Sequence, residues 1–350
     1  MDCSVVDLSP VPADGTATEA YANTVEAARQ AERLGYSRFW VAEHHGIAET
    51  LAGTTPEVLL GHLAAETDSI RLGSGAVLLN HYSPFKVAEQ FGALDALAPG
   101  RIDAGLGRAN GSPAVDRALG TERHVQTPDE DHTEKIDAVV SHLDDDFPPG
   151  HPYADIQIPR SGAQPPVPWV LGSSASSATI AAELGLRFCF AAFIRPQFAE
   201  PAFEAYREQF QPSGRPGGID EPEGMVAVNA VCAETDDRAA RLRATAEASY
   251  KRMERGEVGT TPSVEESIDE LGYVPDPTPA TLDDGEWPRA ISGSPETLAG
   301  LLDQLAERVG VDEVMIQHVV ADHEDALRSH ELLADGVGLC GSTRTTNPTD

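Results

Sequence analysis

Strand-like and helix-like segments alternate along almost the whole chain, and this order constrains the fold more than any other feature. Short apolar runs such as "SRFWVA" and "RFCFAAF" are each followed by a longer segment with helical spacing of apolar residues. Helices between successive strands predict a parallel sheet. Roughly eight such units occur without a change of composition. They favour an α/β fold of the closed (β/α)8 TIM-barrel type over an open doubly wound sheet.

A single domain is expected over residues 1–335, and the polar stretch 336–350 is predicted to be a disordered tail. The Pro- and Gly-rich stretch 144–168 is expected to be an excursion on the surface. Residues 256–291 are acidic, Pro-rich and without periodicity. Thr18 is expected to cap the first helix.

The charge balance restricts the partners of this chain. It has 57 acidic and 25 basic residues, of which only Lys86, Lys135 and Lys251 are lysines, and its formal net charge is −32 at pH 7. Such a surface repels phosphate backbones, which argues against a nucleic-acid partner. Few lysines beside dispersed carboxylates are typical of salt-adapted proteins, in which salt shortens the Debye length to about 3 Å. We expect a halophilic protein that unfolds in dilute buffer; an ordinary acidic cytosolic enzyme is the alternative.

Cysteine usage and hydropathy indicate a cytoplasmic protein. Cys3, Cys189, Cys232 and Cys340 show no CxxC spacing, so they are expected to be reduced and mostly buried thiols. No apolar run approaches the ~18 residues that span a bilayer. The start "MDCSVVDLS" lacks the basic region of a signal peptide. No membrane association is expected.

Two adjacent histidines follow the predicted strand "RFWVA". His44 and His45 would therefore lie at the C-terminal face of a barrel, where active sites of this fold are found. Because side chains alternate along a strand, one imidazole can face the barrel mouth while the other turns toward the scaffold. A purely structural role is the alternative. A metal site with His62 and His81 is disfavoured, because adjacent histidines do not easily ligate one ion and no HExxH or CxxC spacing is present.

Two glycine-containing stretches indicate that another group approaches the backbone closely. Gly73 and Gly75 lie in "LGSGAVLLNHYSP", and Gly105 and Gly107 precede Arg108 in "AGLGRANGS". A bulge or tight barrel packing is the alternative. On so acidic a chain a lone loop arginine indicates an anion site, with a salt bridge as the alternative. A dinucleotide fingerprint is excluded, because the third glycine of GxGxxG is missing.

A serine-rich turn, "LGSSASSAT", joins a predicted strand to a predicted helix. Free N–H groups at a helix start and serine hydroxyls can both donate to an anion. Gly172, Ser173, Ser174, Ser176 and Ser177 therefore predict a phosphate site, with a serine-rich helix cap as the alternative. A nucleophilic serine is not expected, because GxSxG is absent.

Taken together, these stretches resemble the bacterial-luciferase-like monooxygenases, a family of flavin-using (β/α)8 barrels with insertions. The resemblance runs from Val5 to Leu333 and rests on the order of "VAEHHG", "IRLGSGAVLLNHYSPFKVAEQFGALDALAPGRIDAGLGRANG", "PWVLGSSASSAT" and "SGSPETLAGLLDQL". It is closest to single-chain members rather than to the light-emitting heterodimer. It implies a flavin cofactor and a homodimer. It also implies a mobile loop over the site at residues 256–291, for which a plain surface insertion is the alternative.

The resemblance also assigns roles to individual residues. His44 matches the active-site histidine that transfers a proton near the reactive edge of the flavin. Gly75–Ala76 matches a non-prolyl cis peptide whose bulge supports the isoalloxazine ring. Arg108 matches a phosphate-binding arginine.

The serine turn is matched in the same way. Ser173, Ser174 and Ser177 match the phosphate-contacting turn, which Gly172 begins, although light-emitting members carry a carboxylate at the position of Ser173. Gly107 stands where those enzymes have a reactive cysteine, which argues against bioluminescence.

The leading interpretation is an FMN-dependent monooxygenase that acts with O2 on a small organic substrate. A separate reductase is expected to supply reduced FMN, because no NAD(P)H fingerprint is visible. Trp40, Leu78 and Phe193 are expected to line an apolar mouth that excludes water. Two alternatives are a deazaflavin-dependent hydride transfer and a non-catalytic flavin-binding protein, and the presence of His44 argues against the second.

Overall fold

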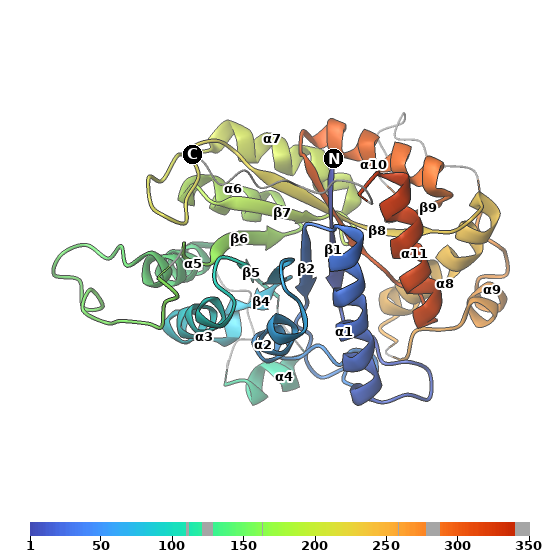
Figure 1. The fold of residues 1–350 in the computed structure, drawn as a ribbon, viewed down its shortest axis with the longest axis horizontal. Coiled ribbons are helices and arrows are strands. Elements are labelled where there is room, and N and C mark those ends of the chain that lie inside the picture. Colours follow the sequence, from blue (N-terminus) through green and yellow to red (C-terminus); the bar gives the residue numbers. More distant parts are fainter. Residues whose placement is uncertain (110–111, 121–128, 163, 258, 278–287, 340–350) are drawn as a thin grey trace.

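Pairing between the first and the last strands closes the sheet into a barrel. The computed structural model describes all residues except 110–111, 121–128, 163, 258, 278–287 and 340–350. Neighbouring barrel strands follow one another in sequence order and are parallel, and β10 pairs with both β1 and β8. The predicted (β/α)8 architecture is confirmed (Figure 1). The barrel strands are β1 (Asp2–Asp7), β2 (Arg38–Val41), β3 (Arg71–Ser74), β5 (Ile102–Gly107), β6 (Val167–Gly172), β7 (Arg187–Ala191), β8 (Gly224–Cys232) and β10 (Glu313–Gln317).

Helices surround these strands on the outside (Figure 1). The longer ones are α1 (Ala17–Leu34), α2 (Pro56–Glu66), α3 (Pro84–Leu97), α5 (Asp129–Asp144), α6 (Ala175–Leu184), α7 (Ala199–Gln209), α8 (Asp236–Glu254), α10 (Pro295–Val309) and α11 (His323–Gly336). Smaller elements are β4 (Val77–Leu78), α4 (Pro113–Ala118), α9 (Val264–Leu271), β9 (Ala290–Gly293) and the 3₁₀ turns Leu79–His81 and Pro196–Phe198.

The first helix begins earlier than the sequence pattern predicted. Thr16, not Thr18, caps α1, because a glutamate stands three residues after it. The Glu19 carboxylate accepts from the Thr16 backbone N–H at 2.7 Å, and the Glu19 backbone N–H donates to the Thr16 hydroxyl at 3.3 Å. This reciprocal pair satisfies two otherwise free N–H groups. Gly35 ends the helix with φ of 88°.

Side chains alternate between an outer and an inner core. The outer faces of the strands pack against the helices in one large apolar cluster. A smaller group of buried side chains, the inner cluster, fills the barrel interior: Val6, Trp40, Ala42, Trp169, Cys189, Met225, Ala227 and Met315. The expected thiol state is found for Cys3, Cys189 and Cys232, which are free and buried. Cys340 lies outside the described residues.

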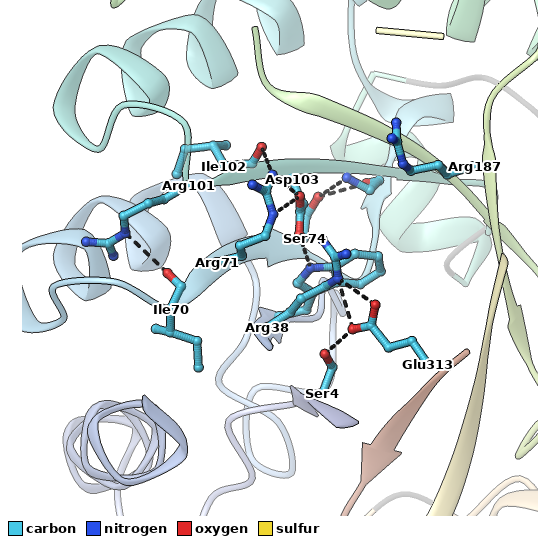
Figure 2. A network of polar contacts seen from close by, with 12 residues as sticks. Ser4, Arg38, Ile70, Arg71, Ser74, Arg101, Ile102, Asp103, Arg187 and Glu313 are labelled. Atoms are coloured by element: carbon cyan, nitrogen blue, oxygen red, sulfur yellow. Dashed lines mark hydrogen bonds and ion pairs between the residues drawn. The ribbon is translucent and has the colours of Figure 1, made fainter. Parts of the chain in front are cut away.

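Below the inner cluster, a set of paired charges closes the N-terminal end of the barrel. This ionic floor consists of Ser4, Arg38, Arg71, Asp103 and Glu313, near the first residues of their strands (Figure 2). Arg38 donates to Glu313 at 2.9 Å and to Asp103 at 3.0 Å, and Arg71 contacts the other oxygen of Asp103 at 2.5 Å. Ser4 donates to Glu313. Each charge in the floor therefore has a partner.

Two predicted irregular regions contain more structure than expected. Residues 256–291 include α9, which begins with a capping box between Ser263 and Glu266, so the absence of periodicity was a wrong guide there. The tail predicted from residue 336 is ordered at its start, because Val337 and Leu339 pack partly buried against the outer core. Its remainder lies outside the described residues. The excursion after α5 extends away from the barrel (Figure 1).

Candidate active site

His44 stands just beyond the C-terminal end of β2, on the side that faces the barrel interior. Its inward direction follows from alternation, because Trp40 and Ala42 belong to the inner cluster. The His44 backbone N–H donates to the Gly53 carbonyl at 2.8 Å, which fixes the loop. The Nδ1 atom is buried and has no hydrogen-bond partner among the described residues. Burial, and then the charge of His45, lower the pKa of His44 to about 4, so the imidazole is neutral at physiological pH.

His45 turns the opposite way, toward a buried glutamate that the sequence did not single out. The Glu43 carboxylate contacts His45 Nε2 at 2.5 Å and accepts from the Tyr82 hydroxyl at 2.6 Å and from the Leu78 backbone N–H at 2.8 Å. Glu43 is only 3% exposed. Its partners come from two later segments, so the pattern "AEHH" alone gives no sign of this network. It ties the histidine loop to the chain that follows Ala76.

The predicted cis peptide is found between Gly75 and Ala76. A Cβ on Gly75 would lie 3.0 Å from Val6 Cγ2, and a Cβ on Gly107 would lie 2.8 Å from the Cβ of Ala76. A side chain at either glycine would therefore press on the bulge or on its surroundings. A glycine is required at position 105 for a different reason: a Cβ there would lie 1.8 Å from the Ser74 carbonyl oxygen. Tight packing between β3 and β5, the alternative considered for the glycines, accounts for Gly105.

Arg108 follows β5 and contacts Asp129, a residue near the serine turn that the sequence did not single out. Its Nη1 lies 2.5 Å from Asp129 Oδ1, at the start of α5. The nearby Ser176 hydroxyl, and then the Arg108 guanidinium, lower the pKa of Asp129. Arginine, carboxylate and serine turn therefore meet at one place. No local pattern links Asp129 to Arg108, because the connection between β5 and α5 decides their proximity.

The serine turn joins β6 to α6 directly. Ser174 is the N-cap of α6 and makes no side-chain cap hydrogen bond, and its Oγ lies 3.4 Å from Ser177 Oγ. A Cβ on Gly172 would lie 2.0 Å from Ser177 Oγ, so only glycine leaves room for this hydroxyl. Ser173 lies between Gly172 and the cap. The turn thus presents hydroxyls and the free N–H groups of a helix start, as an anion site requires.

The predicted residues gather along four strands that are consecutive in the sheet. His44 follows β2, Gly75 and Ala76 follow β3, Arg108 follows β5, and the serine turn follows β6. All lie at the C-terminal end of the barrel, opposite the ionic floor. Among the described residues, no three His, Cys, Asp or Glu side chains form a group suited to a metal ion.

The expected apolar wall is only partly as predicted. Trp40 is fully buried in the barrel interior and donates from Nε1 to Asp103 at 3.0 Å, so it lies below the mouth and does not line it. Leu78 is half-buried in β4, and Phe193 packs partly buried against the inner cluster.

The described helices include none that is long and apolar enough to cross a membrane.

Comparison with known proteins gives one consistent family. The luciferase-like monooxygenase family matches residues 1–313. A luciferase-like monooxygenase of Escherichia coli (strain K12) is 34% identical over 332 residues, covering 95% of this chain and 96% of that protein. An N-acetyl-S-alkylcysteine monooxygenase of Bacillus subtilis (strain 168) is 36% identical over 335 residues, covering 95% and 97%.

Solved structures agree with this assignment. The crystal structure of apo-MsnO8 has a TM-score of 0.84 at 38% identity and covers 97% of this chain and 98% of its own. Two more distant structures share the fold alone. One is the oxygenating constituent of 3,6-diketocamphane monooxygenase of Pseudomonas putida in complex with FMN (TM-score 0.69, 19% identity, covering 96% and 98%). The other is a secondary alcohol dehydrogenase in complex with a deazaflavin–acetone adduct (TM-score 0.64, 15% identity, covering 96% and 98%).

Proposed function

We propose that this chain, which belongs to the luciferase-like monooxygenase family, is an FMN-dependent monooxygenase that acts with O2 on a small organic substrate. The observation that carries the proposal is the buried, unpartnered Nδ1 of His44, in the loop after β2, whose Val41 carbonyl accepts from the Gly75 backbone N–H of the cis peptide at 2.9 Å. A buried polar atom without a partner is rare in folded proteins and calls for an explanation such as a bound ligand. The flanking anion site at Arg108 supports a ligand with a phosphate tail.

The residues at the mouth fit FMN in both of its parts. Arg108 and the hydroxyls of Ser174 and Ser177 would hold the phosphate, where the start of α6 adds N–H groups. Gly75 and Gly107 keep side chains away from the bulge, where a flat ring would lie. FMN, when bound and reduced, supplies the electrons with which O2 is activated.

His44 would handle the proton of this reaction. Because burial lowers its pKa to about 4, it is a neutral imidazole near pH 7 and can accept a proton at Nδ1 or hold one there. The Glu43 network keeps His45 turned away, so that one imidazole faces the barrel interior. The apolar inner cluster below excludes water from the site.

Replacing His44 with alanine tests the catalytic role. We expect turnover to fall by about 10²–10⁴-fold, while the dissociation constant for FMN changes by about threefold or less. His151→Ala is the matched control, because His151 lies in the surface excursion after α5, away from the mouth and from α2 and α3. Equal losses of turnover and of FMN affinity in His44→Ala would instead favour a non-catalytic flavin-binding protein.

The deazaflavin-dependent hydride transfer is the second candidate, supported by the dehydrogenase that shares the fold. Native mass spectrometry after incubation with FMN and with a deazaflavin separates the two cofactors. We expect FMN to be retained. A chain that retains only the deazaflavin would overturn the monooxygenase proposal. NADPH oxidation by the purified chain alone would overturn the need for a separate reductase.

The same spectra report the oligomeric state, which we propose to be a homodimer through α2 and α3. Val58 on α2 is 73% exposed and Leu97 on α3 is 72% exposed. Ala65 and Ala96 are exposed on the same two helices. A partner subunit that packs against α2 and α3 would cover these exposed apolar side chains. A monomeric mass at micromolar concentration would contradict this proposal.

A further inference from the structure

Two side-chain amides lie side by side in the upper barrel interior. Met225 and Ala227 of β8, and Met315 of β10, belong to the inner cluster. Side chains alternate along a strand, so Asn229 and Gln317 are the next inward-facing positions on these two strands. The two residues are register partners in the β8–β10 pair. Neighbouring strands are about 4.8 Å apart, which places the amides next to each other.

Both amides are buried and incompletely satisfied. Asn229 is 2% exposed and Gln317 is 5% exposed. Asn229 Nδ2 and Gln317 Oε1 have no hydrogen-bond partner among the described residues. An unpaired polar group in a barrel interior is costly, because it has lost water without gaining a replacement. Two such groups on adjacent strands indicate a ligand that supplies the missing hydrogen bonds.

The strand register gives the position of the amide pair relative to the Gly75–Ala76 peptide. Val6 is the register partner of Gln317, and a Cβ on Gly75 would lie 3.0 Å from Val6 Cγ2. The pair is thus at the level of the Gly75–Ala76 peptide. Glu313 of the ionic floor lies four residues earlier on β10, about 13 Å lower at the usual rise per residue. The amides are therefore separate from the floor and lie toward the C-terminal end of the barrel, which carries the site.

The chemistry of the pair defines what it binds. One unsatisfied atom is a donor and the other an acceptor, so the complementary group carries a carbonyl and an N–H close together. The inner cluster below contains no charged side chain to compensate an ion, which favours a neutral group. We propose that Asn229 and Gln317 recognise an amide or imide edge. This inference rests on the proposed flavin function, because two ligands of such a site carry that edge: the pyrimidine end of the flavin ring and an amide of the substrate.

The experiment uses the full chain with two near-isosteric variants, Asn229→Leu and Gln317→Met. Gln30→Met is the matched control, because Gln30 is also a buried amide with an unpartnered Oε1, but it lies on α1 outside the barrel. Circular dichroism verifies folding, and Asn229→Ala and Gln317→Ala replace any variant that does not fold. Affinities are measured for FMN, for riboflavin, and for two thioether probes in the presence of FMN. The probes are N-acetyl-S-methylcysteine and 3-(methylthio)propanoate, which lacks the acetamide.

The amide or imide edge can belong to the flavin ring or to the substrate, and the two cases give different results. If the flavin ring is bound, both variants weaken FMN and riboflavin equally, by about tenfold or more. If a substrate amide is bound, flavin affinity is kept, and the variants remove the preference for the acetylated probe. Wild-type affinity for FMN and both probes in the two variants overturns the inference alone, because the pair then serves only packing or water. A wild-type chain that binds no flavin overturns the proposed function, and the inference with it.

Discussion

The two ends of the barrel treat buried polar groups in opposite ways. At the N-terminal end, Arg38 donates to Glu313 at 2.9 Å and to Asp103 at 3.0 Å. At the C-terminal end, His44 Nδ1 and the amide atoms of Asn229 and Gln317 are buried without partners. The floor is complete in itself, whereas the mouth has buried groups that a ligand would satisfy under the proposed function. On that proposal, the difference separates residues that hold the barrel together from residues that carry function.

Breaking the floor should have the largest effect on stability. Asp103→Ala leaves two arginines and the Trp40 N–H without their buried acceptor, so we expect a loss of about 3–5 kcal/mol in the free energy of unfolding. Denaturant unfolding measures it. The control is Asp325→Ala, which removes an exposed pair with Arg238 and should cost about 1 kcal/mol or less. A folded Asp103 variant that has lost FMN affinity but little stability would break the comparison.

Removing the cation at the mouth should have a smaller effect, and on affinity instead of stability. Under the proposed function, Arg108→Ala would delete a charge-assisted hydrogen bond to the flavin phosphate, which is worth about 1.5–3 kcal/mol, or roughly 10–100-fold in FMN affinity. Riboflavin has no phosphate, so its affinity should not change. Isothermal titration of both ligands measures the difference. An equal loss for riboflavin would mean that Arg108 shapes the loop and does not bind the phosphate.

We expect acid to lower the free energy of unfolding through buried histidines, and not through the carboxylates of the floor. Burial lowers the pKa values of His44, His132 and His318 to about 4, whereas the unfolded histidine value is 6.5. The unfolded chain therefore binds more protons between these values, and stability is lost as pH falls from about 6.5 to about 4, by up to about 3 kcal/mol per histidine. The pKa of Glu313 in the floor is raised by burial, so its protonation does not oppose folding there.

Unfolding curves across this pH range test the assignment. The pH dependence should be shallower in His44→Asn, which has no group that titrates in this range. An unchanged slope would show that His44 is not the buried, neutral group described here.

The smallest effect is expected from the carboxylate that touches Arg108. Asp129 is 57% exposed, and it competes with an incoming phosphate for the same guanidinium. Asp129→Asn should tighten FMN binding about two- to fivefold and leave riboflavin unchanged. Fluorescence titration of both ligands measures it. Weaker FMN binding would show that Asp129 positions Arg108 for the phosphate and does not compete with it.

The sequence predicted the mouth better than the floor. His44, the Gly75–Ala76 peptide and the serine turn each lie in one short segment with a local signature, and the strand–helix order was enough to bring them to one end of the barrel. Asp103 and Glu313 gave no signal, because their partners lie on strands far away in the chain. Glu43 was missed for the same reason. α9 was missed because acidic composition obscured the short pattern at Ser263.

The most direct test is a titration of the wild-type chain with FMN, at low and high salt, followed by competition with inorganic phosphate. The account predicts saturable binding of one FMN per chain, with riboflavin binding more weakly and phosphate displacing FMN but not riboflavin. Absence of saturable binding by either FMN or a deazaflavin at every salt concentration would contradict it, because the unpartnered groups at the mouth would then have no flavin to satisfy them.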